Sequence, residues 1–132
     1  MSFVPDGAEP NDVERRFSGL QRLYGEHACK VMQGSHVVVI GIGGVGSWAA
    51  EALARSGVKK LTLIDLDHIA ESNINRQVHA VSKTVGMAKV TAMKDRITLI
   101  NPGCSVRCVD DFVTPQNWPG ILGGPVDAVI EL

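Results

Sequence analysis

Gly41-Ile42-Gly43-Gly44-Val45-Gly46 is the stretch of sequence that decides the fold of this chain. A β-branched run at residues 36–40 precedes it, and an alanine-rich segment at residues 47–56 follows it. A continuous β-branched run is typical of a strand that is buried on both faces of a parallel sheet. A strand, a G-x-G-x-x-G turn and a helix in this order predict a nucleotide-binding βαβ unit.

Four glycines of this turn are candidate ligand contacts. Gly41 permits the tight turn, Gly43 lets the backbone approach a phosphate, and Gly46 lets the helix and strand pack closely. With Gly44, they leave the backbone N–H groups at the start of the helix directed at an anion. We therefore predict that all four bind a nucleotide.

Two acids follow the next buried strand, which the pattern predicts at residues 60–65. Asp65 lies about 20 residues after Gly46, the spacing at which a carboxylate accepts a hydrogen bond from a ribose hydroxyl. Asp67 is a less direct candidate for the same contact. Up to this point a nicotinamide-dependent oxidoreductase fits as well as any other enzyme that binds an adenine nucleotide.

The loop Asn73-Ile74-Asn75-Arg76-Gln77 and the following Lys89 favour a triphosphate. A dinucleotide needs no pair of cations at this place, whereas the planar fork of Arg76 and the mobile charge of Lys89 both suit phosphate oxygens. Together they would stabilise the negative charge on a departing pyrophosphate, which makes them the predicted catalytic residues. The alternative is that both are solvated surface cations.

The whole chain is predicted to be α/β, Rossmann-like, with a mainly parallel sheet and helices on both faces. Residues 1–14 are expected to form a loose tail, and residues 15–132 one domain that is truncated at a strand, where a ligand-binding loop should follow. The predicted strands are 36–40, 60–65, 105–109 and 127–132, and the predicted helices are 15–34 with a break near Gly25, 47–56 and 86–100.

Composition argues against several classes of protein. The formal net charge is -1, so no electrostatic case for a nucleic-acid or membrane partner exists. The longest apolar stretch is far shorter than the roughly 20 residues that span a bilayer, and the N-terminus does not resemble a signal peptide. Three cysteines at unpaired spacings fit a reducing compartment, so a cytoplasmic protein is expected. The four histidines predict no catalytic triad.

The turn at 41–46 and the runs at 63–67, 72–77 and 86–89 resemble, in order and spacing, the nucleotide site of the ubiquitin-activating-like ThiF/MoeB/HesA superfamily. The resemblance implies that Asp65 binds ribose and that Asn73, Arg76 and Lys89 contact phosphates. It implies ATP and Mg as cofactors. It also implies that a substrate carboxylate attacks the α-phosphate to give an acyl-adenylate and pyrophosphate.

Residues 16–25, 43–48, 75–80 and 109–113 resemble the tRNA threonylcarbamoyladenosine dehydratase branch of that superfamily. This implies adenylation of the threonylcarbamoyl carboxylate on a tRNA, followed by cyclisation with loss of AMP. It also implies a homodimer in which an N-terminal arginine, Arg22 or Arg16, reaches the ATP of the other subunit.

The chain departs from the family pattern at its C-terminal end. Glu131 stands at the first position of the family's D-x-x-D pattern, and the second position, which helps to hold Mg, would lie beyond Leu132. No metal ligand is therefore assigned within the chain, and the family's substrate contacts and any catalytic cysteine would also lie beyond its end. The alternatives are adenylation of a ubiquitin-like sulfur-carrier C-terminus, with a sulfur-carrier or sulfurtransferase protein as partner, and a truncated, non-catalytic nucleotide-binding or dimerisation module.

Overall fold

The fold is that of a computed structural model, which describes residues 10–132. The chain begins with helix α1 (Pro10–Tyr24), which is followed by α2 (Glu26–Gly34), so the predicted break at Gly25 is confirmed. Residues 10–14 are helical, although the sequence placed them in a loose tail. Val13 extends the apolar face that continues at Phe17, four residues later. The rest of the expected tail lies outside the described residues.

The predicted strands are confirmed within a residue or two at each end. The elements after α2 are β1 (His36–Ile40), α3 (Gly46–Arg55), β2 (Lys60–Ile64), α4 (Lys89–Ile100), β3 (Ser105–Val109) and β4 (Ala128–Glu131), with short 3-10 turns η1 (Glu71–Asn73), η2 (Ser82–Thr84) and η3 (Gly120–Leu122). Helix α4 begins three residues later than predicted, because backbone hydrogen bonds and a β-bridge tie residues 86–88 to residues 68 and 69. Lys89 therefore opens the helix.

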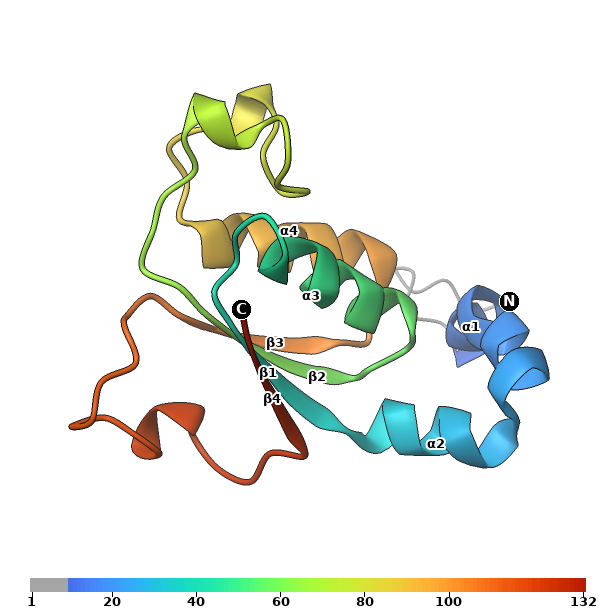
Figure 1. The fold of residues 1–132 in the computed structure, drawn as a ribbon. Coiled ribbons are helices and arrows are strands. Elements are labelled where there is room, and N and C mark those ends of the chain that lie inside the picture. Colours follow the sequence, from blue (N-terminus) through green and yellow to red (C-terminus); the bar gives the residue numbers. More distant parts are fainter. Residues whose placement is uncertain (1–9) are drawn as a thin grey trace.

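The four strands form one parallel sheet in the order β3-β2-β1-β4. The chain moves from β1 outward to β3 and then returns to place β4 on the other side of β1. The carboxyl ends of β1 and β4 thus flank the point where the strand order reverses, which is where open α/β sheets bind ligands. Figure 1 shows the excursion between β2 and α4 standing over the start of α3 at this end of the sheet.

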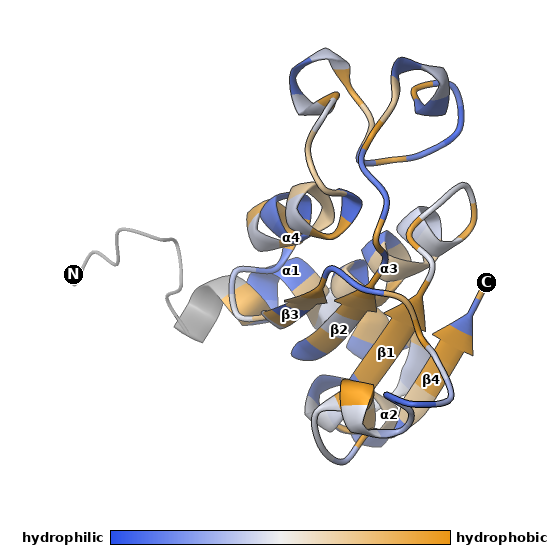
Figure 2. Cartoon of the chain, turned by 90° about the vertical axis from the view of Figure 1, so that its left-hand side faces the viewer, coloured by the Kyte–Doolittle hydropathy of each residue, from blue (hydrophilic) through white to orange (hydrophobic). Residues whose placement is uncertain are grey.

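The two faces of the sheet are covered unequally. Helices α3 and α4 lie side by side on one face (Figure 1) and enclose the main core with the inward side chains of the strands. On the other face, Val38 and Ile64 pack against Ile121 and Leu122 of η3. The strands carry mostly hydrophobic residues (Figure 2), and the two central strands, β1 and β2, are buried almost throughout, as strands covered on both faces are. The α/β, Rossmann-like class is therefore confirmed.

Polar side chains join α3 to α4. The Asn101 amide, which is 2% exposed, donates to the carbonyl oxygens of Ala54 (3.2 Å) and Val58 (3.1 Å). Glu51 of α3 accepts a hydrogen bond from Arg96 of α4. Burial pushes the pKa of the Glu51 carboxyl upward, but the hydrogen bond and charge of Arg96, with Arg55, hold that pKa below its usual value. The two helices are thus held in register.

Replacing Gly46 by alanine is expected to destabilise the chain by about 3 kcal/mol or more. A Cβ at Gly46 would lie 1.6 Å from the carbonyl oxygen of Gly41, so the backbone would have to move. The matched control is Gly19→Ala in α1, where a Cβ meets nothing within 4 Å. This control should be neutral or should stabilise by up to about 1 kcal/mol. Urea unfolding of both variants tests the pair, and equal stabilities would contradict the steric argument.

Candidate functional site

The glycine turn leaves β1 and enters α3 with almost no free space. Gly41 has a φ of +91°, and its N–H donates to the Ile64 carbonyl (2.9 Å), which extends the β1–β2 pairing by one residue. The Gly43 carbonyl accepts hydrogen bonds from both the backbone N–H (3.0 Å) and the hydroxyl (2.5 Å) of Ser47. The first turn of α3 therefore folds directly back onto the loop.

The backbone N–H groups of residues 43–46 are available to a ligand. Within the described part of the chain, none of these four groups donates a hydrogen bond. They lie at the N-terminus of a helix of ten residues, whose dipole adds positive potential. Gly44 is exposed, and Gly43 is partly exposed. The turn thus has the form of an anion site, as the sequence predicted.

Asp65 ties the end of β2 to this turn. Its carboxylate accepts a hydrogen bond from the N–H of Ile42 (2.7 Å) through one oxygen and from the N–H of Asp67 (2.8 Å) through the other. Each carboxylate oxygen keeps further acceptor capacity for a hydroxyl group. The side chain of Asp67 is exposed, and its carbonyl accepts the N–H of Lys89 (3.0 Å). Asp67 therefore connects Asp65 to the start of α4.

The loop that holds Arg76 lies against the glycine turn. The stem of Arg76 comes within 3.7 Å of the point where a Cβ on Gly44 would sit. Its guanidinium donates to the Ser72 carbonyl (2.9 Å) and the Asn75 side chain (3.2 Å). The Asn73 side-chain oxygen accepts the N–H of Ala70 (2.8 Å), so only its amide N–H groups are available to a phosphate.

Lys89 is buried, with 7% of its surface exposed. Its ammonium group makes no hydrogen bond or ion pair with any residue of the described chain. Among the described residues, the fully buried polar side-chain atoms without a partner belong to Gln77 and His79, so the Lys89 ammonium reaches solvent at the end of a buried stem. An unpaired ammonium in this position can meet an anion, and the side chain of Arg76 is exposed.

His79 and Gln77 belong to this site, although the sequence analysis assigned neither to it. The Nε2 of His79 donates to the carbonyl oxygen of Ile42 in the glycine turn (2.8 Å), which fixes the neutral tautomer. Its Nδ1 and the Oε1 of Gln77 are buried and have no hydrogen-bond partner among the described residues. Burial lowers the pKa of His79, and the charge of Lys89 acts in the same direction. The one available signal was their position directly after Arg76.

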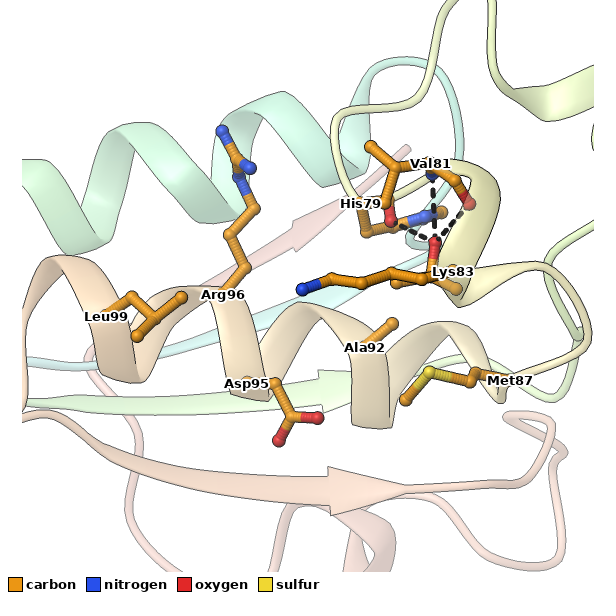
Figure 3. A pocket seen from close by; sticks show the side chains of 9 residues that line it. His79, Val81, Lys83, Met87, Ala92, Asp95, Arg96 and Leu99 are labelled. Carbon is orange, nitrogen blue, oxygen red and sulfur yellow. Dashed lines mark hydrogen bonds between the residues drawn. The ribbon is translucent and has the colours of Figure 1, made fainter.

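A cavity of about 400 Å³ lies beside His79, between η2 and α4 (Figure 3). Val81, Met87, Ala92 and Leu99 give it apolar walls. None of the predicted nucleotide contacts lines it, so it is separate from the glycine turn and shares only His79 with the site.

The cysteines take no part in this site. Cys29 is buried, and burial raises the pKa of the Cys104 thiol to about 11 and also raises that of Cys108. Thiols with raised pKa values are poor nucleophiles. Among residues 10–132, no three metal-ligating side chains gather at one point.

His79 should make the stability of the chain depend on pH. The folded state holds its pKa below the usual value of 6.5, so the unfolded state binds more protons in the interval between the two values. The stability that neutral His79 contributes is therefore fully present above pH 6.5. It is lost as the pH falls from 6.5 towards the lower pKa of the folded state. Urea unfolding between about pH 7.5 and about pH 5.5 should show this loss in the parent chain. The loss should be smaller in His79→Gln, which keeps a donor but cannot titrate, and parallel profiles would contradict the assignment.

Comparison with known proteins shows the family to which this chain is similar. The model of the ThiF family matches residues 15–132. The chain is 56% identical over 103 residues to the tRNA threonylcarbamoyladenosine dehydratase of Escherichia coli (strain K12), covering 78% of this chain and 38% of that protein. It is 48% identical over 124 residues to the Haemophilus influenzae protein of the same name, covering 94% of this chain and 48% of that protein. The chain thus spans about half the length, or less, of these curated relatives.

A solved structure extends the similarity to the backbone. The Escherichia coli tRNA N6-threonylcarbamoyladenosine dehydratase in complex with ATP matches with a TM-score of 0.87 and 51% identity, over 89% of this chain and 49% of that chain. The Escherichia coli molybdopterin-synthase adenylyltransferase is 38% identical over 93 residues, covering 70% of this chain and 37% of that protein. The family model matches residues 15–132, and the glycine turn, Asp65 and Lys89 lie in one site. This chain therefore belongs to the ThiF family.

Proposed function

We propose that this chain is the nucleotide-binding part of an enzyme that uses ATP to adenylate a carboxylate. The observation that carries the proposal is the set of four free N–H groups at the start of α3, together with Lys89, whose stem is buried and whose ammonium has no partner among the described residues. That arrangement suits several phosphate oxygens. Membership in the ThiF family favours it over the nicotinamide-dependent alternative.

Each residue of the site is assigned to one part of the nucleotide. Asp65 binds the ribose through the free lone pairs of its carboxylate, and the N–H groups of residues 43–46 bind phosphate oxygens. The amide of Asn73 also contacts phosphate. Arg76 and Lys89 hold the β- and γ-phosphates and stabilise the charge that grows on the leaving pyrophosphate. A Mg ion bound with the triphosphate would neutralise part of the phosphate charge, and no described residue is assigned as its ligand.

The proposed substrate is the threonylcarbamoyl group of a tRNA adenosine. Its carboxylate oxygen attacks the α-phosphorus, and the bond from that phosphorus to pyrophosphate breaks. Attack of the side chain on the acyl-adenylate then closes a ring and releases AMP, so the carboxylate loses one oxygen in a net dehydration. The two bacterial dehydratases at 48% and 56% identity support this substrate. The molybdopterin-synthase adenylyltransferase at 38% identity supports the second candidate, a sulfur-carrier protein C-terminus.

We further propose a cytoplasmic homodimer in which an arginine of α1 reaches the partner's ATP. Arg16 donates to the carbonyl oxygens of Leu99 (3.3 Å) and Ile100 (3.0 Å) at the end of α4 in its own chain, which favours Arg22 for that contact. Helices of the length and apolarity that crossing a membrane requires are absent from residues 10–132.

Calorimetry with ATP-Mg and with NAD distinguishes the two nucleotide classes. The 132-residue chain should bind ATP and not NAD, and Arg76→Ala should weaken ATP binding by about 10- to 100-fold while leaving the fold intact. Circular dichroism checks the fold of the variant. Equal binding of ATP by Arg76→Ala and the parent chain would remove Arg76 from the phosphate site.

Lys89→Met should separate binding from stability. Methionine keeps an apolar stem of similar length and removes a charge that has no partner among the described residues, so the melting temperature should stay about the same. The affinity for ATP should fall by about 10- to 100-fold. Lys94→Met on the exposed side of the same helix is the matched control and should change neither quantity. A loss of stability in Lys89→Met would mean that the ammonium has a stabilising role in the free protein.

A further inference from the structure

Three hydrogen bonds attach residues 76–79 to the glycine turn and the first turn of α3. The Trp48 indole Nε1 donates to the Arg76 carbonyl (2.8 Å), and the Val78 N–H donates to the Ser47 hydroxyl (3.3 Å). The third bond is the one from His79 to Ile42. Because each bond joins a side chain to backbone, each sets the position of a chain segment. The Trp48 bond is the one that acts on Arg76 itself.

Trp48 is not a core residue. It is the third residue of α3, and 52% of its surface is exposed. An indole that stays half in water gains only part of the free energy of burial, so its hydrogen bond is the more specific contact. That bond spans 28 positions of sequence and ends on the residue that we assign to the phosphates.

The position of Arg76 depends on its backbone more than on its side-chain contacts. The guanidinium is exposed and makes its two hydrogen bonds to neighbours in the same loop, Ser72 and Asn75, which move with it. A flexible side chain reaches a ligand efficiently only when its backbone is already in place, because ordering both at once costs conformational entropy. Trp48 supplies a fixed point for that backbone from the rigid start of α3.

We propose that Trp48 is a positioning residue for Arg76, which holds the Arg76 loop over the glycine turn so that the guanidinium meets the outer phosphates of ATP. This inference rests on the proposed role of Arg76 in phosphate binding. It assigns to Trp48 no contact with the nucleotide. The affinity for a nucleotide without outer phosphates should therefore be independent of Trp48.

The test is calorimetry of Trp48→Phe with ATP-Mg and with AMP. Phenylalanine keeps an aromatic ring and removes the donor, so ATP binding should weaken by about three- to tenfold while AMP binding stays at the parent value. Trp118→Phe is the matched control, since Trp118 lies in the loop between β3 and β4 and its indole donates to no residue of the described chain. That control should bind both nucleotides as the parent does.

A double-mutant cycle with Arg76→Ala separates this inference from the proposed function. If Trp48 acts through Arg76, Trp48→Phe should add no further loss of ATP affinity in the Arg76→Ala background. Parent-like ATP binding by Trp48→Phe, or an equal loss for ATP and AMP, would overturn the inference while Arg76→Ala still showed its own loss. Parent-like ATP binding by Arg76→Ala would instead overturn the phosphate role of Arg76, and the role of Trp48 with it.

Discussion

The close approach of α3 to the end of β1 is the constraint on which the rest of the site depends. At Gly46 the helix backbone lies so near the Gly41 carbonyl that no side chain fits between them. This contact directs the axis of α3 at the turn, and it leaves the N–H groups of residues 43–46 without protein partners. The free N–H groups at the start of α3, which suit an anion, therefore result from a packing requirement.

The other parts of the site are arranged around that turn by backbone contacts. Asp65 accepts the N–H of Ile42, and His79 donates to the carbonyl of the same residue, so the peptide groups on both sides of Ile42 are held. The excursion between β2 and α4 thus brings Arg76 back to the glycine turn, although the two are separated by a helix and a strand. Pre-organisation of this kind reduces the conformational entropy that the protein loses when a ligand binds.

Lys89 combines a buried stem with a charge that has no protein partner among the described residues. Its positive charge is near enough to His79 to act on the pKa of that imidazole. No acid of the described residues pairs with the Lys89 ammonium, whereas Glu51 and Arg96 pair across α3 and α4 in the same layer. The Lys89 ammonium is therefore available to a ligand with negative charge.

The sequence by itself determined the class of fold, the strands and the glycine turn. These features rest on local causes, because β-branched runs, helical periodicity and the steric needs of glycine act over a few residues. The same is true of the presence of Asp65, Arg76 and Lys89 at their spacing. The start of α4 was less well predicted, because the pairing of residues 86–88 with an earlier segment keeps that backbone out of the helix.

Only the tertiary structure decided that Lys89 is buried and unpaired, that His79 supports the glycine turn, and that Trp48 holds Arg76. Each of these facts is a contact, or a missing contact, between segments that are far apart in sequence. Burial and hydrogen bonding at such distances depend on how the strands and helices are stacked, and no residue type or spacing encodes that stacking locally. The sequence by itself shows which residues carry charge. The packing of α3 against β1 determines which of those residues lie at the glycine turn.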